Sequence, residues 1–250
     1  MTYAKNFLSN VVLRLDFAAM PALMTDKKTP FSQAIETRYP NVTANPAQQL
    51  QFTWGAGGTA FEQQPRGWVW THASPSNNRS VILAADSLAI EYKTGEYKNF
   101  AEFRGNIEFV FDAFRQVVHV DQLTRVGLRY IDEIDPGPGD PLDWAGLISS
   151  PLVTSVKAGL MRDMALTRSM HQLTGQLGDM SVLFNYGIHN PDFPSPVARR
   201  LFVLDFDIFV SGGVAAADLV GRVTEMNRCC EQMFEASIED GLRAIMGKAA

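Results

Sequence analysis

The most regular patterns in the chain are two long amphipathic stripes. Between Asn99 and about Val118, apolar residues recur every three or four positions, at Phe100, Phe103, Ile107, Val110, Phe111, Phe114 and Val117. This spacing predicts a helix whose apolar face packs on a sheet. Gly212-Gly213 opens a second predicted helix, with its stripe at Leu219, Val220, Val223, Met226, Cys230, Met233 and Phe234.

Shorter stretches alternate between apolar and polar residues, which predicts strands. These stretches are 10–17, 51–54, 67–72, 80–86, 88–92, 123–135, 161–173, 180–188 and 200–210. Short helices are predicted at 29–38 and 142–147, and Ser237-Ile-Glu-Asp240 is typical of a capping box that begins a terminal helix. Gly55-Ala-Gly-Gly58 and the polar run to Arg66 predict a mobile hairpin loop. A phosphate cradle is disfavoured, because no Lys-Ser/Thr pair follows the glycines.

The two halves of the chain repeat the same order of elements. Val12-Leu13-Arg14-Leu15 resembles Gly127-Leu128-Arg129-Tyr130, and Leu13 and Leu128 lie 115 positions apart. The same shift places Ile90 on Asp205 and Phe100 on Ala215. We therefore expect an α+β fold of two pseudo-symmetric repeats, residues 1–120 and 121–250, packed as one body. Each repeat is expected to hold an antiparallel sheet of about four to five strands with one long amphipathic helix on it.

Composition adds limits on the class of protein. The 250 residues are 46% hydrophobic and 20% charged, as in packed soluble domains. The net charge of −5 does not indicate a nucleic-acid partner. No run of 18 apolar residues and no signal-peptide pattern is present, and the two adjacent cysteines, Cys229 and Cys230, cannot easily form a disulfide with each other. We expect a cytoplasmic protein without a membrane segment.

Two aspartates form the only candidate metal site. Asp205 and Asp207 lie two apart on a predicted strand and so project from one face, where Glu133 or Asp16 could complete a divalent-cation site. The alternative is pairing with arginines of neighbouring strands, for which the candidates are Arg14, Arg129 and Arg200. The four histidines show no metal-ligand spacing and are assigned to the surface or to strand ends. No nucleophile elbow or His-Glu-x-x-His motif occurs, so we predict no catalytic residue and no cofactor.

Aromatic residues form the candidate binding site. Trp54, Trp68 and Trp70 with Arg66 could make a stacking platform for a base or a peptide aromatic side chain. Arg129, in the predicted strand 123–135 near the middle of the chain, is the fifth candidate binding residue. The alternative is that these tryptophans lie close together only because they pack within a sheet, without binding any ligand.

The order of these features resembles a sporadically distributed, uncharacterised family of prokaryotic proteins of about 250 residues. The resemblance is carried by the segments 11–17, 124–131, 203–207 and 234–246, of which Arg125-Val-Gly-Leu-Arg-Tyr130 is the specific string. It implies a prokaryotic origin and transfers no catalytic residues, because the family has no assigned activity. The units of strands followed by a long helix also resemble export-chaperone-like folds found beside toxin–antitoxin pairs.

Three functional hypotheses follow from the sequence. The first is a non-catalytic binding or scaffold protein that acts through protein–protein contacts, in bacterial defence or toxin regulation, with a protein partner or a second copy of itself. The second is a metal-dependent hydrolase or nuclease that uses Asp205 and Asp207. The third is a small-molecule sensor that binds its ligand between the repeats. The sequence favours the first hypothesis over an enzyme.

Overall fold

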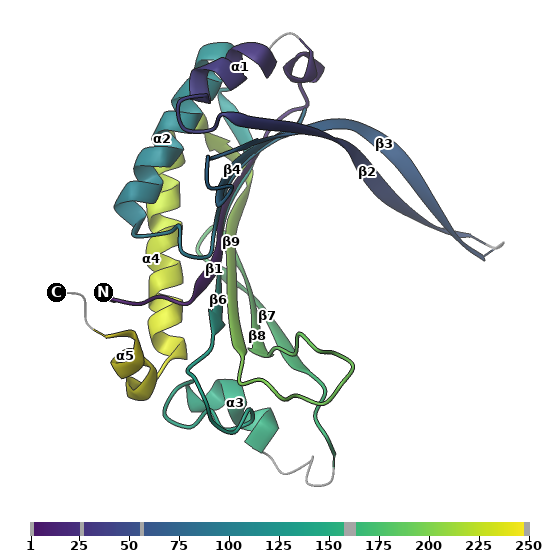
Figure 1. The fold of residues 1–250 in the computed structure, drawn as a ribbon. Helices are drawn as coiled ribbons and strands as arrows, with labels where there is room; N and C mark the ends of the chain where they lie inside the picture. The colour runs from purple at the N-terminus through teal and green to yellow at the C-terminus, as the bar shows by residue number, and fades with distance from the viewer. Residues whose placement is uncertain (1–2, 26–27, 56–57, 158–163, 248–250) are drawn as a thin grey trace.

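The strands that the structure describes all belong to one antiparallel sheet. The computed structural model describes residues 3–25, 28–55, 58–157 and 164–247, and the side chains of residues 47–67 are not among the described groups. The nine strands follow the order β2-β3-β4-β5-β1-β6-β9-β8-β7 (Figure 1). Their bounds are β1 Leu8–Asp16, β2 Asn41–Gly55, β3 Gly58–Ala73, β4 Arg79–Leu83, β5 Ser87–Lys93, β6 Gln122–Ile134, β7 Ser169–Leu177, β8 Met180–Ile188 and β9 Phe202–Ala215. The two sheets expected from the sequence are therefore one, because β1 and β6 pair with each other.

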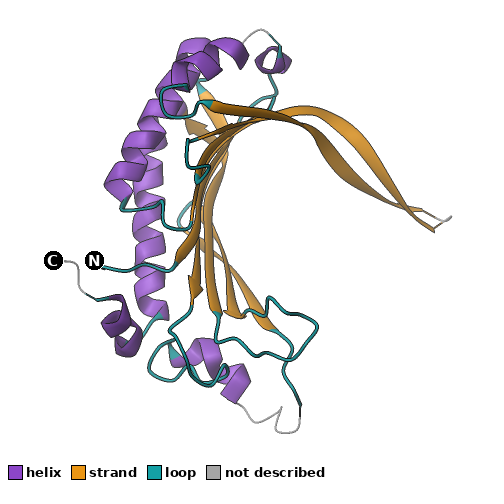
Figure 2. Ribbon diagram, in the orientation of Figure 1, coloured by secondary structure: helices purple, strands orange, loops and turns teal. Residues whose placement is uncertain are grey.

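Helices cover one face of this curved sheet, and the described part of the chain leaves the opposite, concave face without a helix (Figure 2). The helices are α1 Lys28–Ile35, α2 Phe100–Val117, α3 Ser150–Lys157, α4 Leu219–Ser237 and α5 Asp240–Met246, with short 3-10 turns at Pro21–Met24 and Ala216–Asp218. The long helices α2 and α4 run side by side along the covered face (Figure 1). None of the described helices is long and apolar enough to cross a membrane.

The core lies between the sheet and the two long helices. In β1 the alternate residues Val11, Leu13 and Leu15 are buried against the helices, which is the face that the alternation predicts. The stripe of α2 supplies Phe103, Ile107, Val110, Phe111 and Phe114, all buried. Both predicted long helices are confirmed, although α4 begins at Leu219 rather than near Gly212, because β9 continues to Ala215.

Three local predictions are wrong. Within the predicted loop at 55–66, Gly55 ends β2 and residues 58–66 belong to β3, because the two strands form one long hairpin that pairs from Asn41 opposite Ala73 to Gly55 opposite Gly58. Residues 56–57 lie outside the described residues. The predicted helix at 142–147 is a series of turns, and the helix in this region is α3. The strand predicted at 161–173 lies at Ser169–Leu177, and residues 161–163 fall outside the described residues.

Candidate functional site

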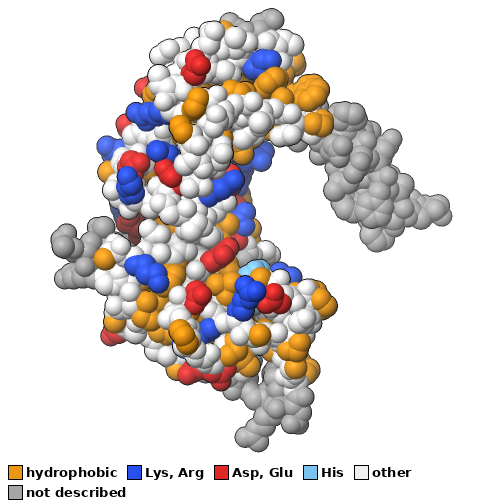
Figure 3. Space-filling model, viewed as in Figure 1, with side chains coloured by type: hydrophobic (Ala, Val, Ile, Leu, Met, Phe, Trp, Pro, Cys, Tyr) orange, Lys and Arg blue, Asp and Glu red, His pale blue; other side chains and the backbone are white. Residues whose placement is uncertain are grey.

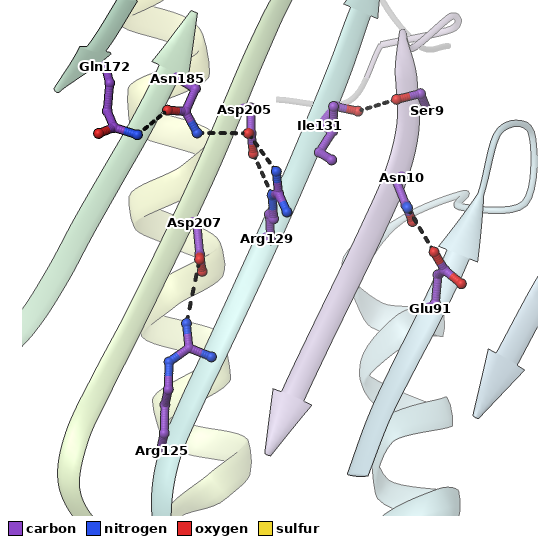
Figure 4. Close-up of polar contacts among 10 residues, drawn as sticks. All are labelled: Ser9, Asn10, Glu91, Arg125, Arg129, Ile131, Gln172, Asn185, Asp205 and Asp207. Atoms are coloured by element: carbon purple, nitrogen blue, oxygen red, sulfur yellow. Dashed lines mark hydrogen bonds and ion pairs between the residues drawn. The ribbon is translucent and has the colours of Figure 1, made fainter. Parts of the chain in front are cut away.

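A row of polar side chains crosses the concave face where β6, β9, β8 and β7 lie side by side (Figure 4). Arg129 of β6 donates two hydrogen bonds to Asp205 of β9, from Nε to Oδ1 at 2.7 Å and from Nη2 to Oδ2 at 2.8 Å. Asn185 of β8 donates to Asp205 Oδ2 at 3.0 Å, and Gln172 of β7 donates to Asn185 Oδ1 at 2.8 Å. The Asp205 side chain is only 8% exposed, so these donors replace most of its contact with water.

The second aspartate of the pair, Asp207, is paired with a different arginine, Arg125. Arg125 Nη2 lies 3.5 Å from Asp207 Oδ2, and the Arg125 guanidinium stacks 4.5 Å from the centre of the Phe209 ring. The guanidinium can lie against the strand because Gly127 has no side chain there, since a Cβ atom at Gly127 would be 2.8 Å from Arg125 Nη1. Burial raises the pKa of Asp207, an effect that Arg125 opposes.

The surroundings of Asp205 and Asp207 favour ion pairing over a metal ion. Two guanidinium groups face the carboxylates, and the described residues contain no group of three or more His, Cys, Asp or Glu side chains able to hold a metal. Asp16 pairs instead with Arg14 on its own strand, with Nε and Oδ1 2.7 Å apart. Of the three arginines considered as partners, only Arg129 meets one of the two carboxylates, while Arg200 donates to the main-chain oxygen of Asp143.

Trp68 and Trp70 lie on the face of the sheet opposite to Arg129. Trp70 is half-buried on the helix-covered face, with Lys28 Nζ 3.7 Å from the centre of its ring. Trp68, two residues earlier in the same strand, projects from that same face and is 53% exposed. The side chains of Trp54 and Arg66 lie outside the described residues. The structure therefore does not join Trp68 and Trp70 to Arg129 in one site.

The histidine His72 and the two cysteines are the other titratable groups that the sequence assigned to a position. His72 is fully buried in β3, against the prediction of a surface or strand-end position, with Nε2 2.7 Å from Ser32 Oγ and Nδ1 3.3 Å from the main-chain oxygen of Val81. Burial lowers the pKa of His72, so the imidazole is neutral near pH 7. Both Cys229 and Cys230 are buried, and burial raises the pKa of each thiol, as expected of unreactive cysteines.

Three residues that matter here were not predicted from the sequence, namely Asn185, Gln172 and Asp132. Asn185 and Gln172 extend the row at Asp205, and only the pairing register of β7, β8 and β9 places them beside it. The position of Asp132 could be predicted from the sequence, because side chains alternate between the two faces of a strand and Asp132 shares the face of Leu128 and Tyr130 in β6. That alternation could have identified Asp132 as a carboxyl group in the core.

No protein-family model matches the chain, and a search of curated proteins finds no match. The resemblance to a sporadically distributed prokaryotic family therefore stays a prediction.

Proposed function

We propose that the chain is a non-catalytic binding protein that holds an extended segment of a partner protein along β7. The observation that supports this proposal is the unprotected edge of β7, which ends the sheet and pairs only with β8 among the described strands. Natural edge strands are usually shortened, bulged or supplied with Lys or Pro, which prevents pairing with other chains. The nine residues of β7 contain no Asp, Glu, Lys, Arg or Pro, and their register with β8 is continuous.

The side chains of β7 offer a partner strand one apolar and one polar side. Leu173 and Leu177 project from the helix-covered face of the sheet but lie beyond its helices, and they are 53% and 51% exposed. Gln172 and Gln176 project from the concave face, where they donate to Asn185 and Ser181 of β8. An added strand with alternating apolar and polar residues would match both sides, as in other cases of recognition by strand addition.

The main chain of β7 is also positioned for strand addition. β7 and β8 are joined by the two residues Gly178-Asp179, and Leu177 lies opposite Met180. In such a short hairpin the flanking pair exchanges hydrogen bonds, and hydrogen-bonded pairs alternate along the ladder. The N–H and C=O groups of Gln172, Thr174 and Gln176 therefore point away from β8, towards the free edge.

Two variants of β7 test this proposal. Thr174→Pro removes one outward N–H and leaves the ladder with β8 intact, since Pro is tolerated where the N–H of an edge strand faces solvent. The pair Leu173→Lys and Leu177→Lys replaces the exposed apolar side with charge. We expect each variant to reduce capture of the partner by about tenfold or more, which is at least about 1.4 kcal/mol of binding free energy. Capture is measured by cross-linking and affinity purification from the source cell, followed by mass spectrometry.

The matched control is Ile245→Lys in α5. Ile245 is 39% exposed, and its substitution is also from apolar to charged, but α5 lies on the far side of the sheet from the free edge of β7 (Figure 1). This control should capture the partner as well as the wild-type chain does. Equal capture by the wild type and both β7 variants would contradict the proposal. Capture of only further copies of the chain would assign the edge to self-association.

Charge on the visible surface supports a protein partner. Figure 3 shows Lys and Arg side chains interspersed with Asp and Glu over the described part of that view, with no broad patch of one sign. Nucleic-acid binding depends on clustered positive charge. A neutral edge strand on a surface of mixed charge is instead suited to main-chain hydrogen bonds with another protein.

We also infer that residues 1–120 and 121–250 are related repeats. β1 and β6 pair antiparallel with Leu13 opposite Leu128, so two residues that the sequence equates face each other, as a twofold axis between the strands would require. β5 pairs with β1 and β9 pairs with β6, and each is followed by a long helix. The spacing increases along the chain, since Ile90 and Ile208, the partners of Leu13 and Leu128, lie 118 positions apart.

A further inference from the structure

A pocket of about 180 Å³ lies on the helix-covered side of the sheet. Its walls are the N-terminal segment, the residues that begin α2, the strands β6 and β9, and the helices α4 and α5. Tyr97 and Phe100 come from residues 1–120, whereas Tyr130 and Phe234 come from residues 121–250. The pocket is thus placed where the third sequence hypothesis, a small-molecule sensor with its ligand between the repeats, requires one.

The wall of this pocket contains a buried carboxyl group without a partner. Asp132 of β6 is only 4% exposed and lines the pocket. Among the described residues its carboxyl oxygens accept no hydrogen bond and meet no Lys or Arg, and burial alone raises its pKa to about 8. Buried polar groups are nearly always paired in native proteins, so an unpaired one calls for an explanation. A ligand that enters the pocket would provide the missing partner.

The rest of the lining is acidic and aromatic. Tyr130 donates to Asn227 Oδ1 at 2.8 Å, and Asn227 Nδ2 donates to Glu231 Oε1 at 3.1 Å. Glu235, which accepts a hydrogen bond from Tyr3 at 2.7 Å, also lines the pocket. Glu235 is already paired with Arg243, whose Nε lies 3.2 Å from Glu235 Oε2. Asp132 and Glu231 have no such cation among the described residues, and the only Lys or Arg that lines the pocket is the exposed Lys98. Aromatic rings complete the wall at Phe100, Phe206 and Phe234.

We propose that this pocket binds a small organic cation, with an ammonium group against Asp132 and an apolar body of about one ring among the phenylalanines. Asp132 is protonated in the free protein near pH 7, so the ammonium group binds with release of the Asp132 proton to solvent and then pairs with the carboxylate. The faces of aromatic rings also attract cations. The size is suitable, since an apolar cavity of about 150 Å³ holds benzene. This site is independent of the partner strand proposed at β7, because it lies deep against α4 rather than at the sheet edge.

The test uses three probes of nearly the same shape with the full chain. 2-Phenylethylamine is cationic at pH 7, 2-phenylethanol is neutral and phenylacetate is anionic, so their dissociation constants isolate the effect of charge. By isothermal titration calorimetry we expect the amine to bind at least about tenfold more tightly than the alcohol, and phenylacetate to bind least. Asp132→Asn keeps the shape of the side chain and should reduce this preference for the amine at least about tenfold.

Controls separate binding from folding. Glu133→Gln changes the next residue of β6, which is exposed on the concave face, and should bind the amine as the wild type does. Thr174→Pro should also leave amine binding unchanged, so failure at β7 and failure at this pocket are distinguishable. If Asp132→Asn does not fold, the proposal is tested by the wild type alone, through the ratio of its dissociation constants for the amine and the alcohol. Equal affinity for the three probes, no binding of any of them, or an unchanged amine affinity in Asp132→Asn would overturn the proposal.

Discussion

Asp132 links the protonation of one carboxyl group to the stability of the whole chain. Its pKa is about 8 in the folded protein, against about 3.9 for an ordinary aspartate, and burial is the cause. The titratable and charged groups that line the same pocket are Tyr3, Tyr97, Lys98, Tyr130, Cys230, Glu231 and Glu235. Between about pH 4 and pH 8 the folded chain retains the Asp132 proton, while the unfolded chain has lost it. At Asp132 the folded state therefore binds more protons, and the contribution of this group to stability falls as the pH rises through this window.

We expect the free energy of unfolding to decrease by on the order of 3 kcal/mol between pH 5 and pH 8 through Asp132. Asp132→Asn cannot ionise and should remove this part of the pH dependence. The free energy of unfolding of the variant should therefore rise relative to that of the wild type as the pH rises. Urea denaturation at the two pH values measures the change. Glu133→Gln, exposed on the other face of β6, should keep the wild-type slope. A wild-type slope in Asp132→Asn would show that another group is responsible.

The pairing of Asp205 with Arg129 shows what a single residue pattern can and cannot predict. Two aspartates at positions i and i+2 of a strand must share a face, which the structure confirms. The partner of each carboxylate depends on which strand lies beside β9 and in which register, and neither follows from alternation. Arg129 is therefore one of three candidate partners from the sequence, and Arg125, which is not among the three, faces Asp207.

At the scale of elements, the long helices were predictable because packing and capping agree. The apolar stripe of α2 is buried along its length, and Asn99 precedes the first turn, where its Oδ1 accepts a hydrogen bond from the Glu102 N–H at 2.9 Å. Such a bond satisfies one of the free N–H groups at the start of a helix.

Asn99→Ala should lower the free energy of unfolding by about 1 kcal/mol, because the Glu102 N–H loses its acceptor. Chemical denaturation of the two proteins at one pH measures the difference. Asn78→Ala is the matched control, since Asn78 is an exposed turn residue, and its effect should stay within about 0.5 kcal/mol. Similar losses in the two variants would contradict a capping role for Asn99.

Other elements could not be predicted, because contacts from distant segments form them. The segment 55–66 is rich in Gly and polar residues, which indicates a loop, yet Gly55 ends β2 and the backbone of residues 58–66 belongs to β3, paired with β2. Ser237-Ile-Glu-Asp240 has the pattern of a capping box, but Ser237 ends α4 and donates to the Met233 carbonyl at 2.7 Å. Its main-chain oxygen accepts from the Ser149 N–H, and Ile238 bridges Ile148, so this segment is extended and α5 begins only at Asp240.

At the scale of the whole molecule, the central pair of strands joins the two proposed repeats. β1 and β6 pair from Leu8 opposite Asp132 to Asp16 opposite Arg125. The sequence predicted the order of elements in each half but placed them in two sheets, because side-chain alternation is the same for an internal strand and for an edge strand. Only the pairing of β1 with β6 distinguishes one continuous sheet from two.

This arrangement predicts that neither half of the chain folds alone. Residues 1–120 would leave β1 as an unpaired edge, and residues 121–250 would do the same to β6, while the core shared between α2 and α4 would be exposed to water. We expect neither half to show a cooperative thermal transition, whereas the two halves expressed together should form a one-to-one complex that does. As a control, the intact chain with a protease site inserted at His119–Asp121, between α2 and β6, should stay associated after cleavage. A cooperative transition in either isolated half would instead mean that the chain contains two independent domains, with the β1–β6 pairing as a contact between them.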